Sequence, residues 1–186
     1  MMRELVRRAR TIRRFVEADR IGTATLRELV DLARLTPCGA NLQRLRYRIV
    51  SDPQDCAAVF PCLAWAGFLK EWDGPAEGER PTGYIVMLST GDGSATADTG
   101  IAAQTIQLAA AELGYGACMI GSLQRDSIKQ RLQLPPDCHV NLVIALGRPA
   151  ERVVIEEVPA GADLKYYRTP DQVHHVPKLR LENVLV

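Results

Sequence analysis

The sequence contains no apolar run near the ~20 residues that a membrane-spanning helix requires. Charge of neither sign is in clear excess, because the 186 residues include 23 lysines and arginines and 22 aspartates and glutamates. The total charge therefore gives no support to a nucleic-acid or membrane-surface partner. We expect a soluble protein with neither a membrane nor a nucleic acid as partner.

Patterned cysteines are missing as well. The five cysteines form no C-x-x-C pair and show no zinc-like spacing with His139, His174 or His175. We expect no metal site. An odd number of cysteines without a recognisable signal peptide is typical of free thiols, which indicates the reducing cytoplasm.

Common catalytic motifs are also absent. The chain has no G-x-S-x-G elbow, no H-E-x-x-H pair and no P-loop, and no pair of carboxylates lies near a histidine. We therefore name no catalytic residue. An enzyme with these side chains would need a cofactor to supply its reactive group.

The most informative stretch is residues 98–121. Residues 101–113 are apolar nearly all round a helix, which predicts a buried helix, with Asp98 as its N-cap and Gly114 as its left-handed end. Residues 117–120 are short and apolar and predict a strand buried on both faces. This helix and strand form the predicted centre of the protein.

The remaining pattern predicts one layered domain of helices and about four strands over residues 1–186. Further helices are expected over residues 2–9, from a capping box of Thr25 and Glu28, from an N-cap at Asp52, and from Asp126 to Leu132. Further strands are expected over residues 44–50, 84–88 and 140–146, with a turn at residues 91–93. Residues 151–186 are broken by prolines yet too apolar to stay solvated, so this tail must lie along a surface of its own or a partner's.

Three segments could bind an anion or a polar ligand. Arg10, Thr11 and Arg13 offer two guanidinium groups and a hydroxyl, as a phosphate requires. On spacing alone a solvated arginine-rich helix end explains them better, and a nucleic-acid arm is a third reading. Lys178 and Arg180 form either a second anion site or a solvated strand edge.

The loop at residues 37–43 exposes the amides of Asn41 and Gln43, although it is also readable as an ordinary turn. Tight packing and helix closure explain Gly114 and Gly116 but leave Gly121 less determined.

Taken in order, four segments resemble the FMN-dependent nitroreductase family. R-T-I-R-R-F at residues 10–15 is similar to the family's R-[ST]-x-R-x-F, and P-C-G-A-N-L-Q at residues 37–43 is similar to its P-S-x-x-N-x-Q-P loop. Residues 98–121 resemble its central helix and flavin-facing strand, and V-P-K-L-R at residues 176–180 resembles its closing phosphate clamp.

The resemblance implies an α+β fold with a largely antiparallel sheet flanked by helices, in an intertwined homodimer with FMN in two interface clefts. In the family's roles, Arg10, Thr11, Lys178 and Arg180 would bind the phosphate, and Arg13 would lie near the pyrimidine edge of the flavin. Cys38 and Asn41 would contact the ring and ribityl chain with support from Gln43, and the backbone at Ile120 and Gly121 would approach the ring. Ala9, Cys38 and Arg44 depart from the family's usual arginine, serine and proline.

The implied function is hydride transfer from NADH or NADPH, through bound FMN, to a small acceptor such as a nitroaromatic or quinone in a ping-pong mechanism. There are two alternatives. One is a flavin-fragmenting or dehalogenating enzyme of the same fold, and the other is a flavin-binding protein without turnover. We expect residues 71–81, with Trp65, Phe68 and Trp72, to border the substrate opening, because long loops in compact domains tend to be functional.

Overall fold

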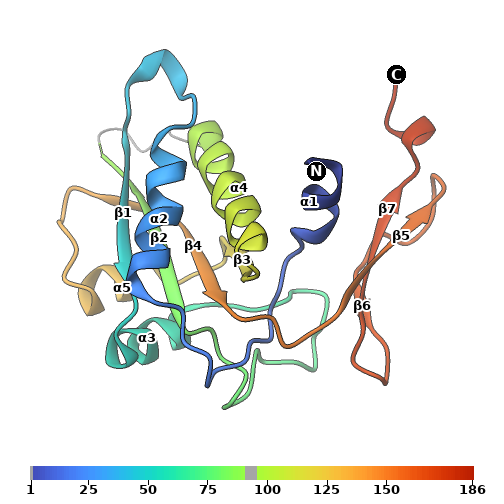
Figure 1. Cartoon of the computed structure of the whole chain (residues 1–186), viewed down its shortest axis with the longest axis horizontal. Helices are drawn as coiled ribbons and strands as arrows, with labels where there is room; N and C mark the ends of the chain where they lie inside the picture. The colour runs from blue at the N-terminus through green and yellow to red at the C-terminus, as the bar shows by residue number, and fades with distance from the viewer. Residues whose placement is uncertain (1, 91–95) are drawn as a thin grey trace.

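The main sheet has four strands, in the order β1-β2-β4-β3, and every neighbouring pair is antiparallel (Figure 1). A computed structural model describes residues 2–90 and 96–186, so the turn predicted at residues 91–93 lies outside the described residues. The strands are β1 (Leu45–Val50), β2 (Gly83–Ser89), β3 (Gly116–Ile120) and β4 (His139–Gly147). The predicted α+β class and the four predicted strands are confirmed.

Helices cover both faces of this sheet. On one face lie α2 (Thr23–Arg34) and α4 (Thr96–Glu112), and on the other lie α3 (Pro53–Val59) and α5 (Arg125–Arg131). The first helix, α1 (Met2–Arg8), lies beside α4, and short 3-10 turns occupy Gly39–Asn41, Phe60–Cys62 and Leu181–Asn183. No helix in the described ranges combines the length and the apolar character needed to cross a bilayer.

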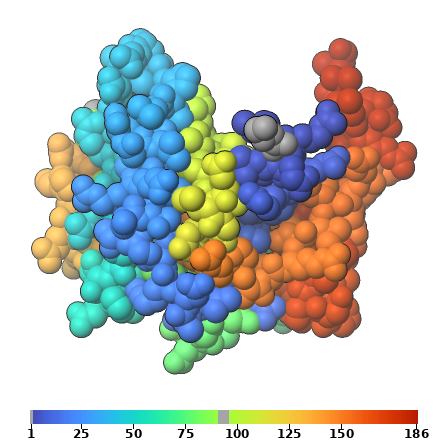
Figure 2. Space-filling model, in the orientation of Figure 1, coloured from blue at the N-terminus to red at the C-terminus, as the bar shows by residue number. Residues whose placement is uncertain are grey.

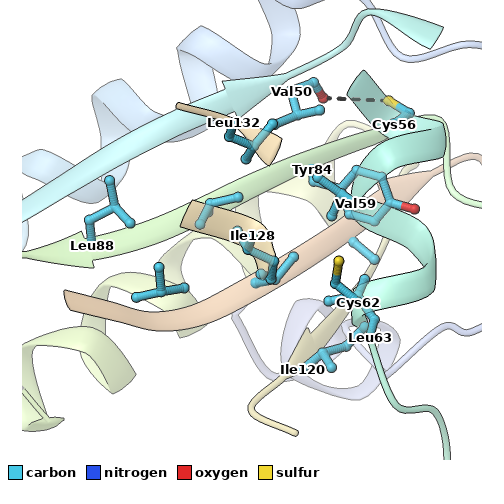
Figure 3. Packing of buried hydrophobic residues seen from close by; sticks show 14 of the residues in the cluster. Val50, Cys56, Val59, Cys62, Leu63, Tyr84, Leu88, Ile120, Ile128 and Leu132 are labelled. Atoms are coloured by element: carbon cyan, nitrogen blue, oxygen red, sulfur yellow. Dashed lines mark hydrogen bonds between the residues drawn. The ribbon is translucent and has the colours of Figure 1, made fainter. Parts of the chain in front are cut away.

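Strand β2 shows why the core has two halves. All seven of its residues are buried. Tyr84, Val86 and Leu88 point to the α3 and α5 side, whereas Ile85 and Met87 point to the α2 and α4 side. Figure 3 shows Tyr84 and Leu88 in one cluster with Val59 and Ile128. Alternation along a strand sends successive side chains to opposite faces, so a strand covered on both faces must be apolar throughout.

The central helix α4 is less buried than its sequence predicts. Small residues such as Ala102, Ala103 and Ala110 are inaccessible and let α4 lie close to the sheet and α2. Ile101 remains 43% exposed and Gln104 is also exposed. The prediction that α4 is buried on every side is therefore wrong within a single chain. One stripe of the helix is exposed to solvent.

The predicted helix starts had mixed outcomes. Asp52 caps α3 as predicted, since its Oδ1 accepts hydrogen bonds from the backbone N–H groups of residues 54 and 55 at 2.8 and 3.3 Å. The capping box at Thr25 is wrong because α2 begins at Thr23 after Gly22. The caps at Asp98 and Asp126 are also wrong, because both residues already lie inside their helices.

The tail forms a second, three-stranded sheet that the sequence did not predict. Its order is β5-β7-β6, with β5 (Val153–Val158) parallel to β7 (His174–Leu179) and β6 (Tyr167–Arg168) antiparallel to it. Figure 1 shows this sheet to one side of the main one, with α1 between it and α4. In Figure 2 the space-filling surface of the tail lies directly against the N-terminal segment. In this chain the tail contacts its own N-terminal segment through polar groups, since Glu151 accepts from the N–H groups of Arg13 and Arg14. Leu164, Leu181 and Leu185 of the tail stay exposed, so their predicted apolar contact is not made within this chain.

Candidate functional site

The basic N-terminal segment runs alongside β3. Thr11 forms a parallel bridge with Ala117, and the N–H of Ile12 donates to the carbonyl of Ala117 at 3.0 Å. Gly116 permits this approach, because a Cβ there would lie 2.7 Å from the Cβ of Ile12. The parallel course brings Arg13 to the end of β3.

At that end, Arg13 lines a cavity of about 190 Å³. Its walls come from residues 64–67, residues 118–122 and Tyr166 of the tail. The cavity therefore joins three of the predicted site residues, Arg13, Ile120 and Gly121, and adds Trp65 from the predicted rim.

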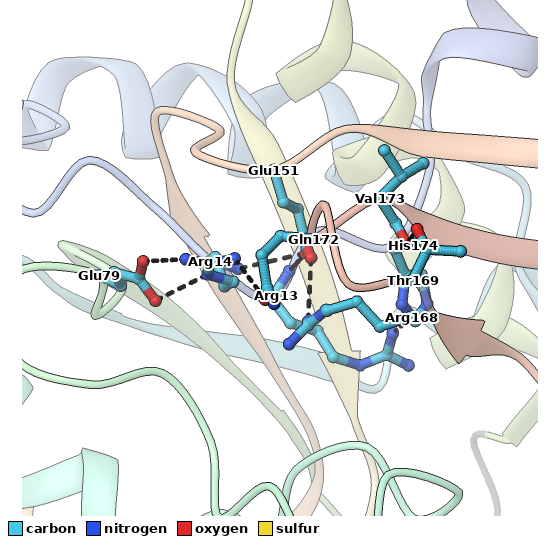
Figure 4. A network of polar contacts seen from close by, with 9 residues as sticks. All are labelled: Arg13, Arg14, Glu79, Glu151, Arg168, Thr169, Gln172, Val173 and His174. Atoms are coloured by element: carbon cyan, nitrogen blue, oxygen red, sulfur yellow. Dashed lines mark hydrogen bonds and ion pairs between the residues drawn. The ribbon is translucent and has the colours of Figure 1, made fainter.

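The guanidinium group of Arg13 makes no ion pair with a carboxylate among the described residues. Its Nη1 lies 3.2 Å from Nε2 of His174, and its guanidinium group lies 4.7 Å from the ring centroid of Tyr166. By contrast, Arg14 makes a bidentate ion pair with Glu79, which raises the pKa of Arg14 and lowers that of Glu79 (Figure 4). The charge of Arg13 is thus left uncompensated beside a cavity, as an arginine that binds an anionic or electron-rich group requires.

Glu151 fixes the backbone of the same segment. Its side chain is fully buried and accepts hydrogen bonds from the backbone N–H groups of Arg13 and Arg14, the latter at 3.2 Å, and from Nη2 of Arg168 at 3.1 Å (Figure 4). A buried carboxylate is tolerated only when it is paired and hydrogen-bonded in this way. Glu151 therefore ties the tail to the N-terminal segment.

His174 completes the surroundings of Arg13. Its side chain is 1% exposed, and burial together with the positive charges of Arg13, Arg168 and His175 lowers the pKa of His174 to about 4. The imidazole is therefore neutral at neutral pH, and its Nε2 can accept a hydrogen bond from Arg13.

Gly121 differs from the glycines that precede it. Gly114 has a left-handed backbone, with φ of +79°, and Gly116 is required by its contact with Ile12. Gly121 is exposed, and the nearest atom to a Cβ placed on it is Cδ1 of Leu142 at 3.9 Å. Within the described chain, neither a close contact nor a left-handed φ requires a glycine at residue 121.

The second predicted group, Cys38, Asn41 and Gln43, lies elsewhere. Figure 1 shows its loop beyond the ends of α2 and β1, on the opposite side of α4 from the tail. Asn41 and Gln43 are exposed and have left-handed φ values of 53° and 48°. Ala40, which precedes Asn41, is also left-handed, with φ of 46°. Non-glycine residues in this region each cost about 1–3 kcal/mol, so the loop is held in a strained, outward-facing form.

The phosphate residues proposed from the sequence are not joined in one chain. Arg10 is partly buried, which lowers its pKa, and its Nη2 donates to the carbonyl of Val6. Lys178 and Arg180 are exposed at the end of β7. In the described chain, no hydrogen bond or ion pair connects either of them with Arg10 or Thr11.

The predicted aromatic rim lies partly at the cavity. Trp65 lines it, whereas Phe68 is 56% exposed and packs on Tyr166, with ring centroids 5.0 Å apart. Trp72 lies under the guanidinium group of Arg168, 4.7 Å from its ring centroid, instead of lining the cavity.

Sequence reasoning missed Glu151, Tyr166 and His174. Only the apolar character of the tail indicated a packed surface, and no local pattern links residues 151, 166 and 174 to residue 13.

The five cysteines are free thiols, as predicted, and the described residues contain no group of three or more His, Cys, Asp or Glu side chains that could hold a metal ion.

The chain has an α+β fold of the nitroreductase type. The family model described as "Nitroreductase family" matches residues 89–148, which include all of α4, β3, α5 and β4. This match confirms the resemblance to the nitroreductase family that the motifs indicate.

Solved structures give the same fold. An FMN-dependent nitroreductase from Clostridium difficile R20291 superposes with a TM-score of 0.66 at 22% identity, over 80% of this chain and 87% of that one. A nitroreductase family protein from Clostridium novyi NT gives 0.66 at 20% identity over 80% and 85%. A protein from Exiguobacterium sibiricum 255-15, solved in complex with FMN, gives 0.68 at 16% identity over 81% and 89%. No curated protein sequence matched the chain.

Proposed function

We propose that the protein is an FMN-dependent oxidoreductase that takes a hydride from NADH or NADPH and passes it to a small acceptor, such as a nitroaromatic or a quinone, in a ping-pong cycle. The observation that carries this proposal is the cavity lined by both Arg13 and the exposed Gly121, where the Arg13 guanidinium group has no carboxylate partner in the described part of the chain. The nitroreductase fold adds to it, since one neighbour is an FMN-dependent nitroreductase and another was solved with FMN.

The residues at the cavity suit a flavin ring. Arg13 supplies a cation where a flat ring that gains negative charge on reduction would be stabilised. The exposed glycine at residue 121 lets the backbone come close to a planar group, because no Cβ stands between them. When bound, FMN would supply the hydride chemistry, while the protein binds it, orients it and tunes its charge.

We further propose that each FMN site is completed by a second copy of the chain. Cys38, Asn41 and Gln43 lie on the opposite side of α4 from the tail, so they cannot complete the Arg13 cavity of their own chain (Figure 1). Apolar side chains of the same region are exposed, namely Leu35, Leu42 and Ile101 at 64%, 57% and 43%. A homodimer that covers this surface would bring the loop of one subunit to the cavity of the other.

In such a dimer Arg10, Thr11, Lys178 and Arg180 would bind the phosphate, with the tail of residues 151–186 packing on the partner as well as on its own chain. The free cysteines suit a reducing compartment, so we place the protein in the cytoplasm.

The direct test is the visible absorption spectrum of the purified protein, followed by anaerobic addition of NADPH or NADH. We expect flavin bands that bleach on reduction and return when a quinone is added. Arg13→Gln should lower FMN affinity about tenfold, the loss expected for one hydrogen bond to a charged group. Arg131→Gln, on the exposed end of α5, is the matched control and should change nothing.

A colourless protein that cannot take up added FMN would refute the proposal. Bound FMN that neither nicotinamide cofactor reduces would instead favour a non-reductive flavin protein.

A further inference from the structure

The tail places two side chains directly on Arg13, and neither belongs to the motifs that suggest flavin binding. Nε2 of His174 lies 3.2 Å from Nη1 of Arg13, and the ring of Tyr166 lies 4.7 Å from the Arg13 guanidinium carbon. The two rings also contact each other, with centroids 5.3 Å apart. Arg13 is thus held by a hydrogen-bond acceptor and an aromatic face at the same time.

These contacts hold the arginine without neutralising it. A carboxylate partner would compensate the positive charge, as Glu79 does for Arg14 and Glu151 does for Arg168. A neutral imidazole accepts a hydrogen bond and leaves the charge uncompensated. An aromatic face likewise attracts a cation through its quadrupole and adds no net charge.

The hydrogen-bonding state of His174 follows from its surroundings. For Nε2 to accept from Arg13, the proton of the neutral ring must be on Nδ1. Nδ1 is buried without a hydrogen-bond partner in the part of the chain that the structure describes. Because a buried polar atom without a partner costs free energy, His174 lowers the stability of the folded chain at this position.

We propose that His174 and Tyr166 are positioning residues that fix the Arg13 guanidinium group toward the cavity and keep its full charge available to the bound cofactor. The inference rests on the proposed function, because it assigns the cofactor as FMN. Its consequence is specific: the two residues raise the affinity for reduced FMN more than the affinity for oxidised FMN, because only the reduced ring carries the added negative charge.

The experiment measures the dissociation constants of oxidised and reduced FMN for the full-length protein and its variants. His174→Phe removes the acceptor and keeps a ring, and should raise the ratio of the reduced to the oxidised dissociation constant about tenfold. By the two-electron relation this equals a fall of about 30 mV in the midpoint potential of bound FMN. His174→Gln retains an acceptor oxygen and should restore most of the ratio.

A matched control lies one residue away. His175 contacts Glu156 at 2.7 Å and stacks on Tyr167, so His175→Phe perturbs the same strand without touching Arg13. We expect it to leave the ratio unchanged.

A second pair tests the ring contact independently. Tyr166→Leu should raise the ratio of reduced to oxidised dissociation constants, whereas Tyr166→Phe, which keeps the ring and loses only the hydroxyl that accepts from the Phe68 N–H at 3.3 Å, should not.

The outcomes separate the two proposals. A wild-type protein that binds no FMN refutes the proposed function, and this inference with it. FMN binding with an unchanged ratio in both His174→Phe and Tyr166→Leu overturns the positioning role alone. Equal weakening of both redox forms would also overturn it, because that result indicates a purely structural contact.

Discussion

The two halves of the predicted flavin site differ in how the chain supports them. Around Arg13 the side chains are packed, with a buried Glu151, a buried His174 and a glycine at residue 116 that lets the segment lie on β3. Around Asn41 the backbone is exposed and left-handed at three non-glycine residues. A strained loop persists only when its surroundings fix its form. Within this chain, Asp98 Oδ1 accepts from the N–H of Gly39 at 3.0 Å and Nη1 of Arg46 donates to the carbonyl of Gln43 at 2.8 Å, and the proposed second subunit would cover the rest of the loop.

The largest effect on stability should come from the packed half. Gly116→Val places a side chain on Ile12, where even a Cβ would lie at 2.7 Å, and should lower the free energy of unfolding by about 2–3 kcal/mol. Gly121→Ala meets nothing closer than 3.9 Å and should change stability by less than about 0.5 kcal/mol, while weakening FMN binding. Chemical denaturation and FMN titration of both variants measure the difference. Equal losses of stability would show that Gly121 is as structural as Gly116.

In the exposed half around Asn41, substitutions should weaken FMN binding strongly and change stability little. Replacing Cys38, Asn41 and Gln43 together by alanine should change the unfolding free energy of the chain by less than about 1 kcal/mol, because these side chains pack little within it. The same triple variant should lose most of its FMN affinity, measured by quenching of flavin fluorescence. Full affinity for FMN would remove the loop from the site.

Acid should loosen the packed half before the rest. Because the pKa of folded His174 is about 4 and its ordinary value is 6.5, the unfolded state binds the extra proton first, and stability falls as pH drops from 6.5 toward 4. The lowered pKa of Glu79 acts in the same direction, through loss of its pair with Arg14. Thermal melts at pH 7 and pH 4.5 should differ less for His174→Gln than for the wild type. An identical pH dependence would exclude His174 as a contributor.

The smallest effect on FMN binding should come from a feature that belongs to neither half. Asp52→Ala removes the N-cap of α3 and should cost about 1 kcal/mol of stability. FMN affinity should stay constant, since α3 contributes no residue to the cavity at Arg13. A change in FMN binding with this variant would mean that global stability, and not local structure, controls the other results.

The sequence predicted the main sheet and its helices well because their signals are local. Apolar runs such as those of β2 and β4, and the cap at Asp52, depend on a few neighbouring residues. The starts of α2 and α5 were wrong because Thr25 and Asp126 have side chains that suit a cap equally well inside a first turn. The small tail sheet was missed because the pairing of β5 with β7 joins segments separated by a proline-containing loop.

The site was predictable in its residue types but not in its arrangement. Arg13 and Gly121 were identified as candidates, and the structure places both at one cavity. The contacts of Arg13 with Tyr166 and His174 span about 150 residues and depend on how the tail folds, which no spacing in the sequence reveals.

The central claim, that one FMN site combines Arg13 of one subunit with Asn41 of the other, has a direct test. Arg13→Gln and Asn41→Ala chains carrying different affinity tags are co-expressed, and the mixed dimer is purified and titrated with FMN. We expect each variant homodimer to bind FMN weakly and the mixed dimer to recover one wild-type site, because one of its two sites then contains both intact residues. Two weak sites in the mixed dimer would place both residues in the same chain's site and contradict the account.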